Sequence, residues 1–314
     1  MLIPEKLYGR EREIEALVAA FDRVVAHGTT ELVLVSGYSG IGKSSVVHEL
    51  HKVLVPPRGL FASGKFDQYK RDIPYGTLAQ AFQSLVCSLL RRSEAELGQW
   101  RDSLSEALGP NGRLIVNLVP ELELVIGKQP PVPDLPPQEA QDRFQMVFRR
   151  FLGVFAREEH PLALFLDDLQ WLDVATLDLL EHLVTHSDVR HLLLVGAYRD
   201  NEVSPSHSLP RTLDAIRKAG AFVQEISLAP LFHEDLERLI ADTLSCAPTM
   251  PPLWRDWCTR KPVAVRFSPF SSCQLWPKMD CCASIMTLCA GAGSSIGSTP
   301  RDTPKMWWTS WSGS

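Results

Sequence analysis

The chain has 314 residues, enough for one large domain or two modest ones. Apolar residues make up 45% of it and charged residues 22%, ordinary values for a globular protein with a sizeable core. A net charge of −5 excludes a general electrostatic attraction to nucleic acid or anionic lipid. Because no apolar run approaches the length of a transmembrane helix and no secretion signal is evident, the sequence predicts a cytoplasmic protein with no membrane contact.

The composition changes abruptly near residue 249. Five of the seven cysteines and six of the eight tryptophans follow this point, but only three of the 37 acidic residues do. Two different compositions are therefore joined in one chain, and residues 1–248 and 249–314 require separate interpretations.

Residues 1–248 alternate between helical patterns and short apolar strands. An amphipathic helix is expected over residues 11–25, where Ile14, Leu17 and Phe21 recur at helical spacing. A strand at 31–37 then enters a glycine-rich loop. In chain order, the further expected elements are a helix at 43–54, a strand at 59–65, helices at 75–90, 95–108 and 138–156, a strand at 161–168, a helix at 174–187, strands at 191–198 and 222–228, and a helix at 234–244.

This order of elements predicts the fold class. Apolar strands that alternate with helices are typical of a parallel sheet covered on both faces, so we expect a three-layer α/β domain of the P-loop NTPase type. The proline-rich stretch KQPPVPDLPPQ at 128–138 predicts a surface connector within it.

The sequence GYSGIGKS at 37–44 matches the P-loop pattern G-x-x-x-x-G-K-[ST], between a predicted strand and a predicted helix. Its glycines let backbone N–H groups point at phosphate oxygens, and the following helix adds the positive end of its dipole. We expect Lys43 to reach the β- and γ-phosphates and Ser44 to bind Mg²⁺. The residues expected to hold ATP or ADP in this loop are Gly37, Tyr38, Ser39, Gly40, Ile41, Gly42, Lys43, Ser44 and Ser45.

Two aspartates end the apolar strand PLALFLDD at 161–168. We expect Asp167 to hold Mg²⁺ through water, and Asp168 to orient or deprotonate the attacking water. The alternative is that both carboxylates only cap the next helix.

An arginine, Arg199, directly follows the predicted strand at 191–198. It is expected to face the γ-phosphate, and a surface salt bridge to Asp200 or Glu202 is the alternative. The tripeptide YGR at 8–10 precedes the first helix and is a weaker candidate for covering the adenine ring.

The chain resembles the STAND branch of AAA-type ATPases. The resemblance is to the ATPase module of large bacterial multi-sensor signalling proteins, where it lies between a serine/threonine kinase domain and GAF and histidine kinase domains. The strings that carry the resemblance are LYGRE (7–11), GYSGIGKS (37–44), SGKFDQYKRDIPYG (63–76), LFLDDLQWLD (164–173) and VGAYRDNEV (195–203).

The resemblance implies roles for individual residues. It implies Gly9 and Arg10 near adenine, and Arg199 as the sensor of the γ-phosphate. It also implies an ATPase domain over 1–228 and the first helix of a truncated helical lid over 229–248, because LAPL (228–231) matches the start of that lid. Such modules act as switches, in which ATP binding and slow hydrolysis change how kinase or sensor domains and partner proteins associate. The family's kinase domains and its Gly-x-Pro lid motif are not in this sequence.

Residues 249–314 have no periodic pattern and no paired CxxC metal spacing. With plausible codons, reading 259–270 across codon boundaries gives a string close to AKTGGSPFFAI, which contains the Gly-x-Pro motif. The same shift turns 269–287 into a string with a helix-like apolar pattern, and it turns 302–314 into YTENVVDLMVGK. We hypothesise a frameshift between about Ala247 and Pro252, which makes 249–314 a non-native, disordered tail; the gene sequence across codons 240–255 tests this.

The sequence therefore predicts an ATP-binding, slowly hydrolysing regulatory module with no kinase catalytic domain. The alternative is a non-hydrolysing ATP- or ADP-binding module, or an inactive fragment. A DNA-associated initiator ATPase shares the P-loop core, but residues 1–250 carry 34 acids against 25 lysines and arginines. Since DNA binding needs a basic face, we expect no nucleic-acid partner.

Overall fold

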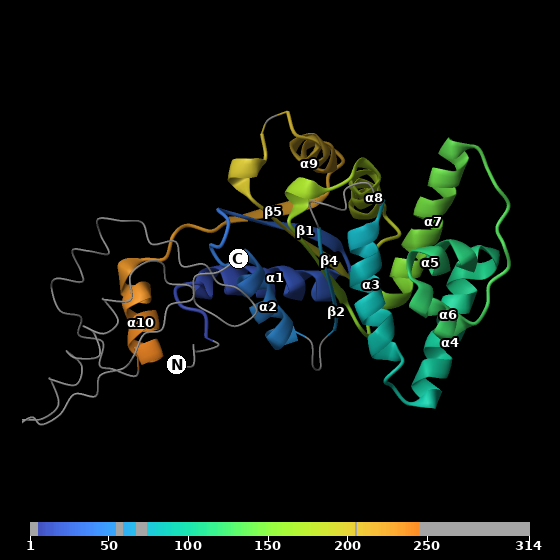
Figure 1. The fold of residues 1–314 in the computed structure, drawn as a ribbon, viewed down its shortest axis with the longest axis horizontal. Helices are drawn as coiled ribbons and strands as arrows, with labels where there is room; N and C mark the ends of the chain where they lie inside the picture. Colours follow the sequence, from blue (N-terminus) through green and yellow to red (C-terminus); the bar gives the residue numbers. More distant parts are fainter. Residues whose placement is uncertain (1–5, 55–58, 67–73, 205, 245–314) are drawn as a thin grey trace, which may run out of the picture. The chain divides into compact units, whose positions relative to one another are not determined.

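The structure is a computed structural model (Figure 1) that describes residues 6–54, 59–66, 74–204 and 206–244. The expected tail at 249–314 and the hypothesised frameshift lie outside these residues. Most of the string FDQYKRD at 66–72 lies outside them as well.

A five-stranded parallel sheet lies at the centre of the domain, with strand order β2-β3-β4-β1-β5. This confirms the predicted α/β fold with a parallel sheet. Each strand begins and ends within about one residue of its predicted bounds. The strands are β1 (Thr30–Ser36), β2 (Leu60–Lys65), β3 (Leu162–Asp167), β4 (Leu192–Tyr198) and β5 (Phe222–Ser227).

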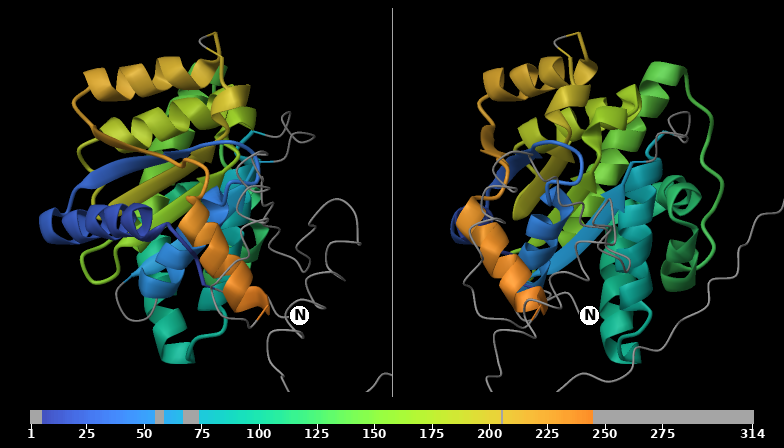
Figure 2. Two further views of the ribbon diagram at one scale, coloured as in Figure 1. Left: turned by 90° about the vertical axis from the view of Figure 1, so that its left-hand side faces the viewer. Right: turned by 60° about the vertical axis from the view of Figure 1, so that its left-hand side comes forward.

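Successive side chains along the strands belong to two separate hydrophobic cores, one on each face of the sheet. On β1, Val33 and Val35 pack with helices α1 (Glu11–His27) and α2 (Lys43–Leu54), whereas Leu32 and Leu34 belong to the opposite core. That second core is covered by α3 (Gly76–Leu89), α8 (Val174–Thr185) and α9 (Ser208–Lys218). Helices therefore cover both faces, as Figure 2 shows, because successive residues of a strand point to opposite sides.

A group of helices is inserted between β2 and β3 and extends the second core. The aromatic rings of Phe82, Phe148, Phe151 and Phe155 join α3 to α7, with Phe82 lying 5.0 to 5.9 Å from the other three ring centres. The predicted proline-rich connector is confirmed, since residues 127–136 carry no helix or strand. The inserted elements are α4 (Glu94–Leu108), α5 (Gly112–Leu118), α6 (Glu123–Ile126) and α7 (Pro137–Phe155), with 3-10 turns at Gly109–Asn111 and Pro120–Leu122.

Strand β5 corrects one expectation, because it is not a buried strand like β1, β3 and β4. It lies at the sheet edge and pairs with β1, and Phe222 keeps 53% of its surface exposed. The Arg23 guanidinium lies over the Phe222 ring at 5.1 Å and also bonds to Glu31 and Gln224. An edge strand has one sheet neighbour, so long side chains from α1 and β1 cover part of its surface.

The last described helix, α10 (His233–Leu244), is bound to the start of the chain. The Tyr8 hydroxyl donates a hydrogen bond of 2.6 Å to Asp242 Oδ2. This bond, together with burial, raises the pKa of Tyr8 to about 12. Within the described ranges, no helix is long and apolar enough to cross a membrane.

Candidate functional site

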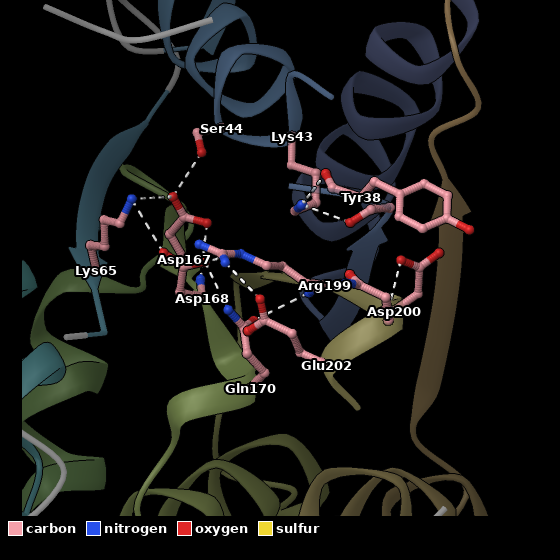
Figure 3. A network of polar contacts seen from close by, with 12 residues as sticks. Tyr38, Lys43, Ser44, Lys65, Asp167, Asp168, Gln170, Arg199, Asp200 and Glu202 are labelled. Carbon is pink, nitrogen blue, oxygen red and sulfur yellow. Dashed lines mark hydrogen bonds and ion pairs between the residues drawn. The ribbon is translucent and has the colours of Figure 1, made fainter. Parts of the chain in front are cut away.

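The candidate site lies at the carboxyl edge of the parallel sheet, where β1, β3 and β4 end side by side (Figure 3). The loop 37–42 leaves β1, Asp167 ends β3, and Arg199 follows β4. Because parallel strands present all their carboxyl ends at one edge, segments far apart in the sequence meet here.

The glycine-rich loop makes a tight turn between β1 and α2. Gly37, Gly40 and Gly42 all have positive φ angles, and Gly42 reaches φ 103°, a conformation that L-residues other than glycine rarely adopt. The loop ends at Lys43, the first residue of α2, so the amino end of a 12-residue helix faces the site. This is the arrangement expected of a phosphate cradle.

Lys43 is buried, with 6% of its surface exposed. Its Nζ donates to the carbonyl oxygens of Gly37 at 2.8 Å and Tyr38 at 2.9 Å. Figure 3 shows the Lys43 side chain beside Tyr38. Burial lowers the pKa of Lys43, whereas the nearby carboxylates of Asp167 and Asp168 oppose this effect. Lys43 is therefore a cation folded back on its own loop, with partners that phosphate oxygens can replace.

The acidic pair is joined directly to the loop. Both carboxylates are buried, and Ser44 Oγ donates to Asp167 Oδ2 at 2.7 Å. The backbone N–H of Asp168 donates to Asp167 Oδ1 at 2.9 Å. Asp168 itself adopts a left-handed backbone with φ 59°, which is uncommon for residues other than glycine and is better tolerated by aspartate than by most.

The alternative role of the acidic pair as a helix cap is wrong. The cap of α8 is Asp173, whose Oδ1 accepts the N–H of Thr176 at 2.8 Å. The side chains of Asp167 and Asp168 instead contact Ser44, Lys65, Gln170 and Arg199.

Lys65 is a site residue that sequence reasoning missed. It ends β2 opposite Asp167 in the parallel register, and its Nζ lies 3.2 Å from Asp168 Oδ2 and 3.8 Å from Asp167 Oδ2. The signal for it was the lysine at the end of the predicted strand 59–65. Finding it required knowing that this strand neighbours β3.

Arg199 makes the anticipated salt bridge to Glu202 and a contact to Asp168 that was not anticipated, while its expected contact with the γ-phosphate stays a prediction. Its Nε lies 3.4 Å from Asp168 Oδ1, and its NH1 lies 2.6 Å from Glu202 Oε1. The guanidinium also lies over the Trp171 ring, 4.9 Å from the ring centre. The other anticipated partner, Asp200, instead accepts the backbone N–H of Asn201. Arg199 therefore contacts the acidic pair through Asp168 and also forms a salt bridge with Glu202.

Gln170, in the 3-10 turn Leu169–Trp171, is a second residue that sequence reasoning missed. Only 3% of its surface is exposed, and its amide lies between Asp168 and the backbone of Arg199. The string LFLDDLQWLD contains this glutamine, but the resemblance assigned no role to it, and the three-dimensional contacts identify that role.

The segment at 8–10 lies beside the glycine-rich loop, and its expected contact with adenine stays a prediction. Arg10 NH2 donates to the carbonyl oxygens of Ala229 at 2.7 Å and Ile41 at 3.3 Å. Gly9 has φ 63°, and a Cβ there would lie 2.2 Å from Asp235 Oδ2, so a larger residue would be strained and would displace the Asp235 side chain of α10. A small hollow here is lined by Leu7, Tyr8, Arg10, Ile41, Gly42 and Leu231.

The donor set fits Mg²⁺ only together with a phosphate ligand. Hydroxyl and carboxylate oxygens such as those of Ser44 and Asp167 are ligands that Mg²⁺ prefers. Among the described residues, however, no group of three or more His, Cys, Asp or Glu side chains could hold an ion by itself. A metal ion here therefore depends on oxygen ligands from a bound nucleotide and water.

Comparison with known proteins matches residues 6–195 to the family described as AAA ATPase domain. The hybrid signal transduction histidine kinase G of Dictyostelium discoideum is 37% identical over 182 residues, which are 58% of this chain and 5% of that protein. Histidine protein kinase 1 of Candida albicans is 23% identical over 183 residues, 54% of this chain and 7% of that protein. The chain thus spans a small part of these relatives' length.

Solved structures with a similar fold are origin-recognition and Cdc6 proteins. Cdc6p from Pyrobaculum aerophilum has a TM-score of 0.44 and 13% identity, covering 78% of this chain and 50% of that one. The Aeropyrum pernix Orc1 protein in complex with DNA has a TM-score of 0.42 and 15% identity, covering 82% and 57%. Likeness at this level carries no argument about function, and the expectation of no nucleic-acid partner stays a prediction.

Proposed function

Because the chain belongs to the AAA ATPase domain family, which implies nucleotide binding, we propose that residues 37–45 bind ATP with Mg²⁺ and that the site hydrolyses it slowly. The observation that carries this proposal is the 2.7 Å bond from Ser44 Oγ to Asp167 Oδ2, which joins the phosphate loop to the acidic pair. A hydroxyl and a carboxylate in contact at the end of a glycine loop suit a Mg²⁺–phosphate complex.

Lys43 carries the proposed phosphate contact. Its ammonium exchanges the carbonyl oxygens of Gly37 and Tyr38 for the β- and γ-phosphate oxygens. Since Lys43 is buried, its attraction to phosphate is stronger than it would be in water. When bound, Mg²⁺ supplies charge neutralisation at the phosphates, and Ser44 and Asp167 are the residues that would hold it, Asp167 through water.

Asp168 and Arg199 are the proposed catalytic residues beside Lys43. Asp168 orients or deprotonates water, and Arg199 contacts the γ-phosphate. In the described arrangement the Asp168 carboxylate accepts from Gln170 and faces both Lys65 and Arg199. Because these partners compete with water for the carboxylate, they support slow rather than rapid hydrolysis.

The regulatory role rests on the signalling relatives. The similarity to a hybrid signal transduction histidine kinase supports a module whose nucleotide state changes how kinase or sensor domains associate. The division into an ATPase domain over 1–228 and a lid helix over 229–248 belongs to this proposal. Helix α10, bound to Tyr8, is the element through which the nucleotide state would act.

A second candidate is a module that binds nucleotide without hydrolysing it. The three partners of Asp168 favour it, because a carboxylate held by Lys65, Arg199 and Gln170 is less available to orient an attacking water. An Asp168→Asn variant separates the two candidates. Hydrolysis predicts that phosphate release by the parent is lost in this variant, whereas simple binding predicts no release from either.

The nucleotide site itself is tested by Lys43→Ala. Mg²⁺-ATP at about 100 times its dissociation constant stabilises a binding protein by about 2.7 kcal/mol, so the parent's unfolding midpoint should rise. The variant should lose most of this rise, because it lacks the buried ammonium. Lys52→Ala is the matched control, since Lys52 lies on the same helix with an exposed side chain. An ATP-dependent rise in Lys43→Ala equal to the parent's would overturn the assignment.

A further inference from the structure

The side-chain amide of Gln170 bridges Asp168 and Arg199 (Figure 3). Its Nε2 donates to Asp168 Oδ1 at 2.9 Å, and its Oε1 accepts the backbone N–H of Arg199 at 3.2 Å. An ionised carboxylate only accepts and a backbone N–H only donates, so these two partners fix the orientation of the amide. A glutamine meets both demands, whereas a glutamate or a methionine does not.

The backbone of Gln170 is held as firmly as its side chain. His207 Nε2 lies 3.0 Å from the Gln170 carbonyl oxygen, and Leu209 donates its N–H to His207 Nδ1 at 3.1 Å. Since Nδ1 is an acceptor, the ring proton is on Nε2, and His207 donates to Gln170. The turn that carries Gln170 is therefore anchored to the amino end of α9.

The next residue in the turn holds the other end of Arg199. The Trp171 ring supports the guanidinium at 4.9 Å, while Gln170 binds the Arg199 backbone. Two adjacent residues thus fix both Asp168 and Arg199, whose charged groups are 3.4 Å apart at Nε and Oδ1. Within this turn, the Gln170 amide is the described group that bonds the Asp168 carboxylate, and Trp171 is the one that supports the guanidinium.

We propose that Gln170 is a positioning residue that holds the Asp168 carboxylate and the Arg199 backbone in place, so that the γ-phosphate of ATP can bind at Arg199. The inference rests on the proposed nucleotide function and names the residue that sets the preference for ATP over ADP. The amide bonds Asp168 Oδ1 and the Arg199 backbone, while the guanidinium pairs with Asp168 and Glu202. An added anion would exchange for these carboxylates at a guanidinium whose position the amide sets. ADP lacks the γ-phosphate, so its binding does not depend on this arrangement.

The test compares the dissociation constants of Mg²⁺-ADP and a non-hydrolysable Mg²⁺-ATP analogue by calorimetry. In Gln170→Glu the preference for the analogue over ADP should fall about tenfold, since a charge-assisted hydrogen bond is lost. The ADP affinity should stay within about twofold of the parent. Gln141→Glu is the matched control, because the exposed Gln141 amide also donates to an aspartate, Asp178, away from the site.

A pH series supplies a readout that a purely structural role would not move. Burial and the adjacent Asp168 raise the pKa of the introduced carboxyl, so acidification protonates it and restores an O–H donor. The preference of Gln170→Glu for the analogue should therefore recover as the pH falls from about 8 to about 6, relative to the parent. If Gln170→Glu does not fold, Gln170→Met carries the comparison of affinities.

The outcomes separate this inference from the proposed function. An unchanged preference in the folded variant, or equal losses for ADP and analogue, overturns the role of Gln170 alone. A parent that binds neither nucleotide overturns the proposed function and this inference with it.

Discussion

At the scale of single residues, the site pairs two buried carboxylates with two cations. Asp167 and Asp168 are nearly inaccessible, and the described cations Lys65 and Arg199 face them from neighbouring strand ends. A buried carboxylate without a partner is strongly unfavourable, so these cations stabilise the pair in the absence of nucleotide. The arriving Mg²⁺-nucleotide then competes with charges that the chain itself supplies.

Replacing Lys65, the last residue of β2, tests this competition directly. Lys65→Met removes a mostly exposed cation that faces both carboxylates, so Mn²⁺ should bind the ADP-loaded protein up to about fivefold more tightly, in line with the strength of exposed ion pairs. Titration calorimetry measures this change, with Lys52→Met as control. Weaker Mn²⁺ binding in Lys65→Met would instead mean that Lys65 helps hold the nucleotide.

The sequence was informative about those site residues that belong to a local motif. Lys43 and Ser44 follow from the glycine loop, and the acidic pair follows from its place at a strand end. Lys65 and Gln170 could not be predicted, because their roles depend on strand order and on a tertiary contact with the backbone after β4. Local patterns identify what a segment is, but the neighbours of its side chains are set by the whole sheet.

At the scale of elements, the contact between α7 and α8 contains a histidine with a pH-sensitive environment. The guanidinium NH1 of Arg149 lies 3.2 Å from His182 Nε2, a contact that suits a neutral ring with an accepting nitrogen. Burial, then Arg149 and His186, lower the pKa of His182, while Asp142 opposes them. The folded state therefore disfavours the charged ring.

This contact predicts a loss of stability on acidification. His182 takes up a proton more readily in the unfolded chain, so its share of the stability is present above the unfolded pKa of about 6.5 and declines as the pH falls through that value. His182→Gln should lose less unfolding free energy than the parent between about pH 7.5 and 5.5. Urea unfolding at both pH values measures this, and the exposed His27→Gln should behave like the parent.

Helices with long periodic patterns could be predicted from the sequence, whereas short helices could not. α5 and α6 have 7 and 4 residues, and helices so short depend on packing rather than on their own pattern. α9 was also missed, although Leu209, Leu213 and Ile216 repeat at helical spacing. Its Pro210 lies in the first turn, where proline is tolerated, but a proline among serines suggests a loop.

At the scale of the whole molecule, the described residues form a sheet with a core on each face, and both cores consist of residues before α10. The frameshift hypothesis adds that residues 249–314 contribute nothing to this domain. The hypothesis lies outside the described residues and stays a prediction.

A chain that ends at Pro248 tests whether residues 249–314 contribute to the stability of the domain. It should unfold within about 2 °C of the full chain, because no residue of the two described cores is removed, and Mg²⁺-ATP should stabilise both equally. Differential scanning calorimetry under reducing conditions, which keep the tail cysteines from forming disulfides, makes the comparison. A much lower midpoint for the shortened chain would mean that the tail packs on the domain.

The bond between Tyr8 and Asp242 links positions 234 residues apart in the sequence. Arg10 and Ala229 form a second bridge between the same two regions, next to Gly9 and its close approach to α10. A protein fused ahead of Lys6 and another fused beyond Leu244 would therefore be attached to the same small patch of the domain. Tension or rotation applied at one attachment would reach the other through two hydrogen bonds, without deforming the sheet.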